Sequence, residues 1–195
     1  AWTWLHKLRA ALVREDREPL GPFVQIDEAL VGGKGSPNKE LVLVAAEPNG
    51  RVRLAHAANN DAATCKRFAD GQIAPQSAVT TDGHAGYNAA SLGARPHEGI
   101  VQTKAERASN DVVQACHWST SNLKRWLLGT HAGAVSDKHL QAYLDEFAFR
   151  YNRRKTKGVG RIAARVIETL VTHAALPMRS RSKQTHRCRW FSRPE

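Results

Sequence analysis

The sequence has few cysteines and no long apolar run. Its three cysteines, Cys65, Cys116 and Cys188, are widely spaced, and none lies in a Cys-x-x-Cys pair. This pattern excludes a disulfide framework and a zinc ribbon, and it favours a reducing, cytoplasmic environment. No run of about 18 apolar residues is present, so no membrane-spanning helix is predicted. Charged residues interrupt the N-terminal apolar stretch, which excludes a signal peptide.

Acidic residues are scarce at the C-terminal end. Residues 150–195 carry 13 lysines and arginines but only two acids, Glu168 and Glu195, so this segment accounts for the whole net charge of +11. Positive charge concentrated in one segment is typical of a surface that binds phosphate groups. The segment therefore predicts a nucleic-acid partner. A solvated basic tail or contact with a membrane surface would give the same composition.

The order of apolar patterns predicts an α/β protein. Strands are predicted at residues 23–30, 41–46, 52–57, 76–81 and 97–102. Helices are predicted at residues 1–16, 61–71, 84–92, 110–130, 136–151 and 162–173. The first three strands follow one another through short turns and predict an antiparallel meander, after which strands and helices alternate. The order βββαβαβα matches a ribonuclease H-like mixed sheet flanked by helices.

Four side chains in this pattern are candidates for chemistry. Asp27 ends the apolar stretch of the first strand, and Asp82 follows the fourth. His117 and Lys124 are seven residues apart in a predicted helix, which is close to two turns and places both on one face. We expect the fold to bring Asp27, Asp82 and His117 together, with Lys124 beside them.

Each of these residues also has an ordinary structural interpretation. A carboxylate after a strand often caps a turn, Asp-Gly is a common turn pair, and a histidine beside an apolar stripe is usually packed. Glu28 is the rival of Asp27, and because strand alternation sends the two to opposite faces, we expect only one of them to reach a site. Two acids at strand ends, combined with a histidine at the edge of the apolar stripe of its helix, favour the functional interpretation.

The residue types fit a divalent metal site. Two Mg²⁺ ions about 4 Å apart can activate the attacking oxygen and stabilise the leaving oxygen in phosphoryl transfer. Mg²⁺ prefers carboxylate, phosphate and water oxygens, so we expect Asp27 to bridge two ions and Asp82 to hold one. Imidazole at the third position suits Mn²⁺ better than Mg²⁺. Lys124 would bind a DNA phosphate as a point charge.

At these residues the chain resembles the DDE-type transposases of bacterial insertion sequences, in the ISXO-like group. The matching motifs are Ile26-Asp27-Glu28, Val31-Gly32-Gly33-Lys34, Thr81-Asp82-Gly83 with Tyr87, Leu123-Lys124-Arg125-Trp126 and Arg150-Tyr151-Asn152-Arg153-Arg154. The resemblance implies that the matching acids bind metal and that the element is cut and joined by transesterification with a 3′-hydroxyl nucleophile. It also implies a bacterial, nucleoid-associated homo-oligomer on DNA, without a small-molecule cofactor.

The chain departs from the resemblance at the third metal position. Most DDE enzymes carry Glu seven residues before the Lys, whereas this chain has His117, and some ISXO-like members vary in this way. Two other pairs have the same spacing: Glu146 with Arg153, and His97 with Lys104, where Pro96 and Gly99 argue against a helix. The absence of a third protein ligand is the remaining alternative.

The resemblance also suggests a domain division. Residues 1–18 would be a helix left from a preceding DNA-binding region, 19–155 the catalytic domain and 156–195 a basic extension. The residues expected to follow the DNA backbone are Lys124, Arg125, Arg150, Arg153, Arg154 and Lys155. Trp118 or Trp126 could stack on a splayed base or simply pack. The predicted function is metal-dependent DNA cleavage and strand transfer. The alternatives are an inactive DNA-binding remnant and a structure-selective nuclease on the same fold.

Overall fold

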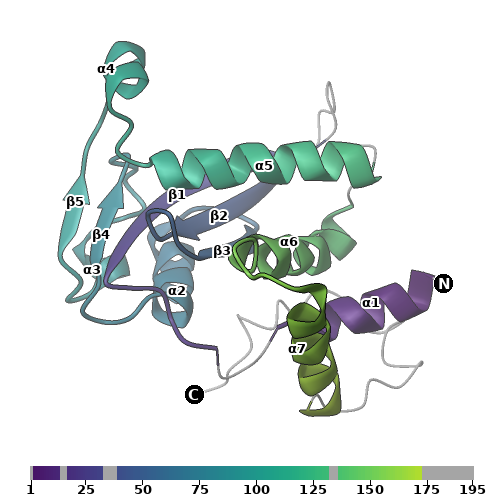
Figure 1. Ribbon diagram of the computed structural model, residues 1–195. Coiled ribbons are helices and arrows are strands. Elements are labelled where there is room, and N and C mark those ends of the chain that lie inside the picture. Colours follow the sequence, from purple (N-terminus) through teal and green to yellow (C-terminus); the bar gives the residue numbers. More distant parts are fainter. Residues whose placement is uncertain (1, 14–16, 33–38, 132–135, 173–195) are drawn as a thin grey trace. The chain divides into compact units, whose positions relative to one another are not determined.

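The computed structural model describes residues 2–13, 17–32, 39–131 and 136–172 (Figure 1). The chain divides into two compact units, one formed by residues 19–135 and the other by residues 1–18 with 136–195. The domain division given above stays a prediction. Across the described residues, no helix is long and apolar enough to span a membrane.

The unit of residues 19–135 is built on a five-stranded sheet. Its strands are β1 (Phe23–Val31), β2 (Glu40–Ala46), β3 (Val52–Ala57), β4 (Ala78–Thr81) and β5 (His97–Gly99). Their order across the sheet is β3-β2-β1-β4-β5. The β1–β2 and β2–β3 pairs are antiparallel, whereas the β1–β4 and β4–β5 pairs are parallel. The predicted meander and mixed sheet are confirmed, and the topology is that of a ribonuclease H-like fold.

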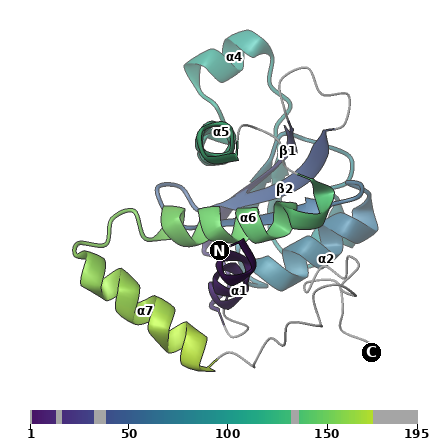
Figure 2. The ribbon, with the colours of Figure 1, turned by 90° about the vertical axis from the view of Figure 1, so that its right-hand side faces the viewer.

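Helices cover both faces of this sheet. Helix α2 (Ala62–Gln72) packs on β2 and β3, and α5 (Gln114–His131) packs on β1 and β2. Figures 1 and 2 show the two helices on opposite faces. The core on the α2 face includes Ile26, Leu43 and Phe68, all nearly inaccessible to solvent. The sheet therefore lies between two helical layers.

Three segments of this unit differ from the prediction, and one of them is β5, which ends at Gly99 and not at residue 102. Residues 84–92 form a turn and then only the short helix α3 (Ala89–Leu92), because the Asn88 side chain accepts hydrogen bonds from the Ala90 and Ser91 amides and starts the helix there. A further helix, α4 (Lys104–Ser109), was not predicted, since it has no apolar stripe and is instead closed by a capping box between Thr103 and Glu106.

The other unit consists of helices α1 (Trp2–Ala11), α6 (Asp137–Asn152) and α7 (Val159–Thr172). Arg9 of α1 forms a mostly buried ion pair with Glu146 of α6, at 2.7 Å. The three helices were predicted, with α1 ending earlier than residue 16. The most basic part of the predicted C-terminal extension, residues 173–195, lies outside the described residues, as do residues 33–38.

Candidate active site

Asp27 and Asp82 are brought together by the pairing of β1 with β4. Ile26 lies opposite Thr81 in this parallel pair, so the next residue on each strand is one of the two acids. Asp82 follows the last residue of β4, where Gly83 has a φ of +86° that turns the chain away. Asp27, by contrast, lies within β1, which continues to Val31. The acids therefore meet where β4 ends beside a longer neighbour.

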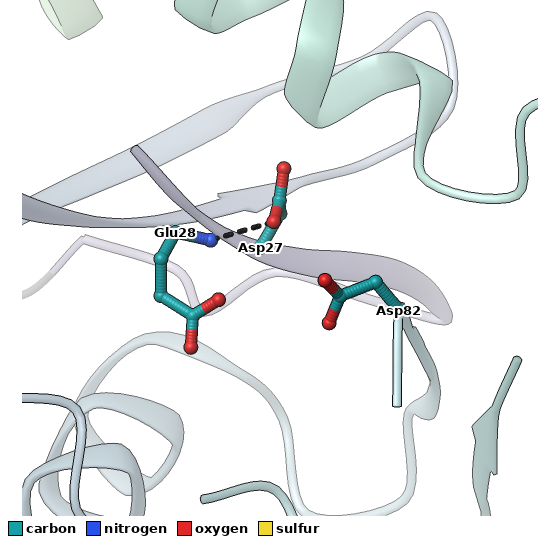
Figure 3. Close-up of side chains that lie close together, drawn as sticks. All are labelled: Asp27, Glu28 and Asp82. Carbon is teal, nitrogen blue, oxygen red and sulfur yellow. Dashed lines mark hydrogen bonds between the residues drawn. The ribbon is translucent and has the colours of Figure 1, made fainter. Parts of the chain in front are cut away.

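Glu28 belongs to the same group of acids, contrary to the expectation that only one of the pair could reach a site. Oxygens of Asp27, Glu28 and Asp82 all lie within 4.8 Å of one another. Figure 3 shows Asp27 and Glu28 leaving β1 in opposite directions, with the Asp82 carboxylate pointing toward them from the side. The alternation of faces is thus correct. The conclusion drawn from it was wrong. Strand β4 ends beside Asp27, and the Glu28 side chain is long enough to bring its carboxylate near Asp82 from the other face.

The acids of β1 are held in an environment that disfavours their negative charges. Burial raises the pKa of Asp27, and the charge of Asp82 adds to this, although the Glu28 amide, which donates to Asp27 Oδ1 at 2.8 Å, and nearby His117 act against it. Burial raises the pKa of Glu28 as well, with His84 opposing and Asp82 contributing. A cation bound beside Asp27 and Glu28 would stabilise their ionised forms.

His117 lies on α5 directly beside Asp27. Its Nε2 is 3.2 Å from Asp27 Oδ2, and its Nδ1 forms a short hydrogen bond with Asp111 Oδ2. The helix is anchored to the sheet at the preceding residue, since the buried Cys116 thiol donates to the Gln25 carbonyl at 3.2 Å. His117 contacts Asp27 but is not a member of the three-residue acid group. The predicted proximity of the histidine to one acid is nevertheless present.

A second histidine contacts Glu28. His84 Nδ1 lies 3.3 Å from Glu28 Oε1, and its Nε2 lies 3.0 Å from the Asn60 side-chain nitrogen. The hydroxyl of Tyr87 is buried close by without a hydrogen-bond partner of normal length in the described chain, and burial together with the Glu28 charge raises its pKa. Glu28 is thus positioned by side chains from the loop after β4 and from the start of the α2 region.

The predicted DNA-contacting residues of this unit lie on the exposed surface of α5. Lys124 and Arg125 are both solvent-exposed, and Lys124 is on the same helix as His117, as the spacing predicted. Trp118 is about half exposed, at 54%. Trp126 is partly buried and its ring meets that of His131 edge-on, with 5.3 Å between centroids, which fits packing.

The remaining predicted DNA-contacting residues belong to the unit of α1, α6 and α7. Arg150 pairs with Glu146 at 2.8 Å, and the Arg153 and Arg154 guanidinium groups lie over the rings of Phe149 and Tyr151. Lys155 is exposed. Their part in DNA binding stays a prediction.

Glu146 and His97, the two alternative candidates for the third metal position, have other surroundings in the structure. The Glu146 carboxylate accepts hydrogen bonds from Arg9 and Arg150, and these hold its pKa below the usual value although burial acts to raise it. His97 lies in β5 and Lys104 in α4, so their seven-residue spacing does not place them on one helix. Of the three histidine and glutamate candidates, His117 is the one that the structure places in contact with Asp27.

Sequence reasoning missed two functional candidates, Glu28 and Asp111. Glu28 was set aside on strand alternation alone. Asp111 has a weak signal, because it precedes His117 by six residues and stands just before the apolar positions of α5 begin. Its contact with the imidazole depends on a turn that the sequence does not specify.

The strand order and the flanking helices define an α/β protein of the ribonuclease H-like class, with clustered acids where β1 and β4 adjoin. The chain matches the family described as the ISXO2-like transposase domain over residues 13–152, well over half its length, and it belongs to this family of insertion-sequence transposases. No curated protein and no solved structure matches the chain. The family acts on DNA, and its DDE-type enzymes generally use divalent metal ions.

Proposed function

We propose that this chain carries out metal-dependent cleavage and strand transfer of insertion-sequence DNA at the site formed by Asp27, Asp82 and His117. The observation that supports this most strongly is the convergence of Asp27 and Asp82 from neighbouring parallel strands, with His117 3.2 Å from Asp27. The family match supports DNA as the substrate, and the acid group supports a divalent metal ion as the cofactor.

The donor set fits one or two Mg²⁺ or Mn²⁺ ions. Oxygen ligands on opposite sides of an octahedral Mg²⁺ are about 4 Å apart, and the acid oxygens here span up to 4.8 Å, so small side-chain rotations bring them into range. When bound, such ions would polarise the attacking hydroxyl and stabilise the leaving oxygen. Asp27, Asp82 and His117 would hold them, and Glu28 adds a fourth donor that the sequence did not predict.

The remaining predicted residues would bind and orient the DNA. Lys124 and Arg125 present exposed positive charge on the helix that carries His117. Phosphate contacts of this kind fix the position of a duplex without reading its sequence. Arg150, Arg153, Arg154 and Lys155 would add non-specific backbone contacts, and two or more copies of the chain would hold paired DNA ends.

A strand-transfer assay tests this function. With a labelled duplex carrying the ends of the element, wild type with Mn²⁺ should form joined products, and Asp82→Asn should reduce them by at least about a thousandfold. The matched control is Asp61→Asn, the same substitution at an exposed helix cap, which should keep full activity because asparagine also caps helices well. Cleavage without joining would indicate a nuclease, and DNA binding without either reaction would indicate an inactive remnant.

A further inference from the structure

His117 has a carboxylate at each of its two ring nitrogens. Nδ1 bonds Asp111 Oδ2, and Nε2 faces Asp27 Oδ2 at 3.2 Å. The Asp111 side chain is 14% exposed and that of His117 32%. The proposed metal site uses only the Nε2 side of this arrangement, so the partner on the Nδ1 side has no role so far.

Asp111 is fixed independently of the histidine. Its Oδ1 accepts the Val113 amide hydrogen at 3.1 Å, and its backbone carbonyl accepts that of Gln114 at 3.3 Å. The turn between them is held by Gln102, whose side-chain oxygen accepts the Val112 amide hydrogen at 3.0 Å. One carboxylate oxygen therefore closes the turn before α5, and this leaves the other directed at the imidazole.

The chemistry of the two groups determines the state of the ring. An ionised carboxylate is only an acceptor, so Nδ1 must carry the proton of this hydrogen bond. In the neutral imidazole the lone pair is then on Nε2, the nitrogen that faces Asp27. Histidines that bind metal ions usually donate their other N–H to a carboxylate or a carbonyl, which fixes the tautomer and raises the basicity of the ligating nitrogen.

We propose that Asp111 is a positioning residue that holds His117 with its Nε2 lone pair directed at the metal site. A neutral imidazole brings no negative charge to a bound cation. The carboxylate of Asp111 lies on the far side of the His117 ring and adds one negative charge near the site. This inference rests on the proposed function, since it gives His117 the role of metal ligand.

The test needs a variant that removes the contact with the ring but keeps the turn. Asp111→Ser meets this need, because a serine hydroxyl can accept the Val113 amide hydrogen but is too short to reach His117. Asp61→Ser is the matched control, since Asp61 caps α2 through the Thr64 amide.

The first readout is the tautomer of His117, observed through the ¹⁵N shifts of its two ring nitrogens in the metal-free protein at pH 8. In wild type and Asp61→Ser, Nδ1 should be protonated because Asp111 accepts its hydrogen, whereas in Asp111→Ser the ring should lose this preference and carry its proton on Nε2, which faces Asp27. The second readout is Mn²⁺ affinity with duplex DNA present, which should fall about 10- to 100-fold in Asp111→Ser only.

An unchanged tautomer or an unchanged Mn²⁺ affinity in Asp111→Ser would overturn the inference. The two readouts also separate it from the proposed function. If wild type takes up no Mn²⁺ at all, the metal site itself is refuted, whereas the ¹⁵N shifts of the metal-free protein still decide whether Asp111 orients the ring.

Discussion

Each face of β1 carries a carboxylate in contact with a histidine, but the surroundings of the two pairs differ. On the α5 face Asp27 meets His117, and on the opposite face Glu28 meets His84. Both acids are largely buried, and burial raises both pKa values. One strand therefore presents two acid–histidine pairs to the same point, the end of β4.

The pairs differ in what holds the far side of each histidine. His117 bonds the carboxylate of Asp111, whereas His84 lies beside the amide of Asn60. A carboxylate both fixes a ring and adds negative charge, while an amide only fixes it. We therefore expect the α5 face to contribute a histidine ligand to the proposed metal site, and the histidine of the other face to keep Glu28 in place.

Exchanging each histidine for alanine tests this difference most strongly. His117→Ala should lower strand-transfer activity by about a hundredfold, because it removes a ligand, whereas His84→Ala should lower it by less than about tenfold, because it removes only a support. Steady-state rates with Mn²⁺ and a pre-cut duplex measure both. Equal losses in the two variants would contradict the asymmetry.

Replacing Glu28 tests whether the second face contributes a donor at all. Glu28→Gln keeps the shape and removes one negative charge from the acid group, so we expect Mn²⁺ affinity to fall about tenfold. Calorimetric titration measures the change. Glu98→Gln, at an exposed position of β5, is the matched control and should bind Mn²⁺ like wild type.

Replacing a lysine on each face tests the predicted DNA contacts of α5. Lys124 is exposed on α5, and Lys66 is on α2, where it pairs with Asp70. Lys124→Ala should weaken DNA binding several-fold and reduce the slope of log affinity against log salt concentration by about 1, while Lys66→Ala should leave both unchanged. Fluorescence anisotropy over a salt series measures both variants. Equal effects of the two substitutions would contradict the prediction that DNA binds on the α5 face.

The smallest effect concerns stability. Because the pKa of Asp27 is raised by folding, its contribution to stability is complete below the unfolded pKa and is lost as pH rises through the folded value. At pH 7 without metal, Asp27→Asn should therefore raise the melting temperature by a few degrees, and the gain should shrink toward about pH 4. Thermal unfolding in chelator at both pH values gives the comparison, and a lower melting temperature at pH 7 would contradict it.

The sequence predicted the strands that carry the site and the meeting of its two aspartates, but it did not predict Glu28 or Asp111. The apolar stretches and turn residues are local signals, so the five strands and the convergence of Asp27 with Asp82 could be predicted. Glu28 could not, because alternation gives the side of a strand but not how far a side chain reaches past the end of its neighbour. Asp111 could not either, since its contact with His117 depends on the turn geometry before α5.

The central claim is that Asp27, Asp82 and His117 hold divalent metal against DNA, and calorimetric Mn²⁺ titration in the presence of a short duplex tests it most directly. Wild type should bind Mn²⁺, Asp27→Asn and Asp82→Asn should lose binding, and His117→Ala should bind about 10- to 100-fold more weakly. Wild-type protein that binds the duplex but takes up no Mn²⁺ would contradict the account.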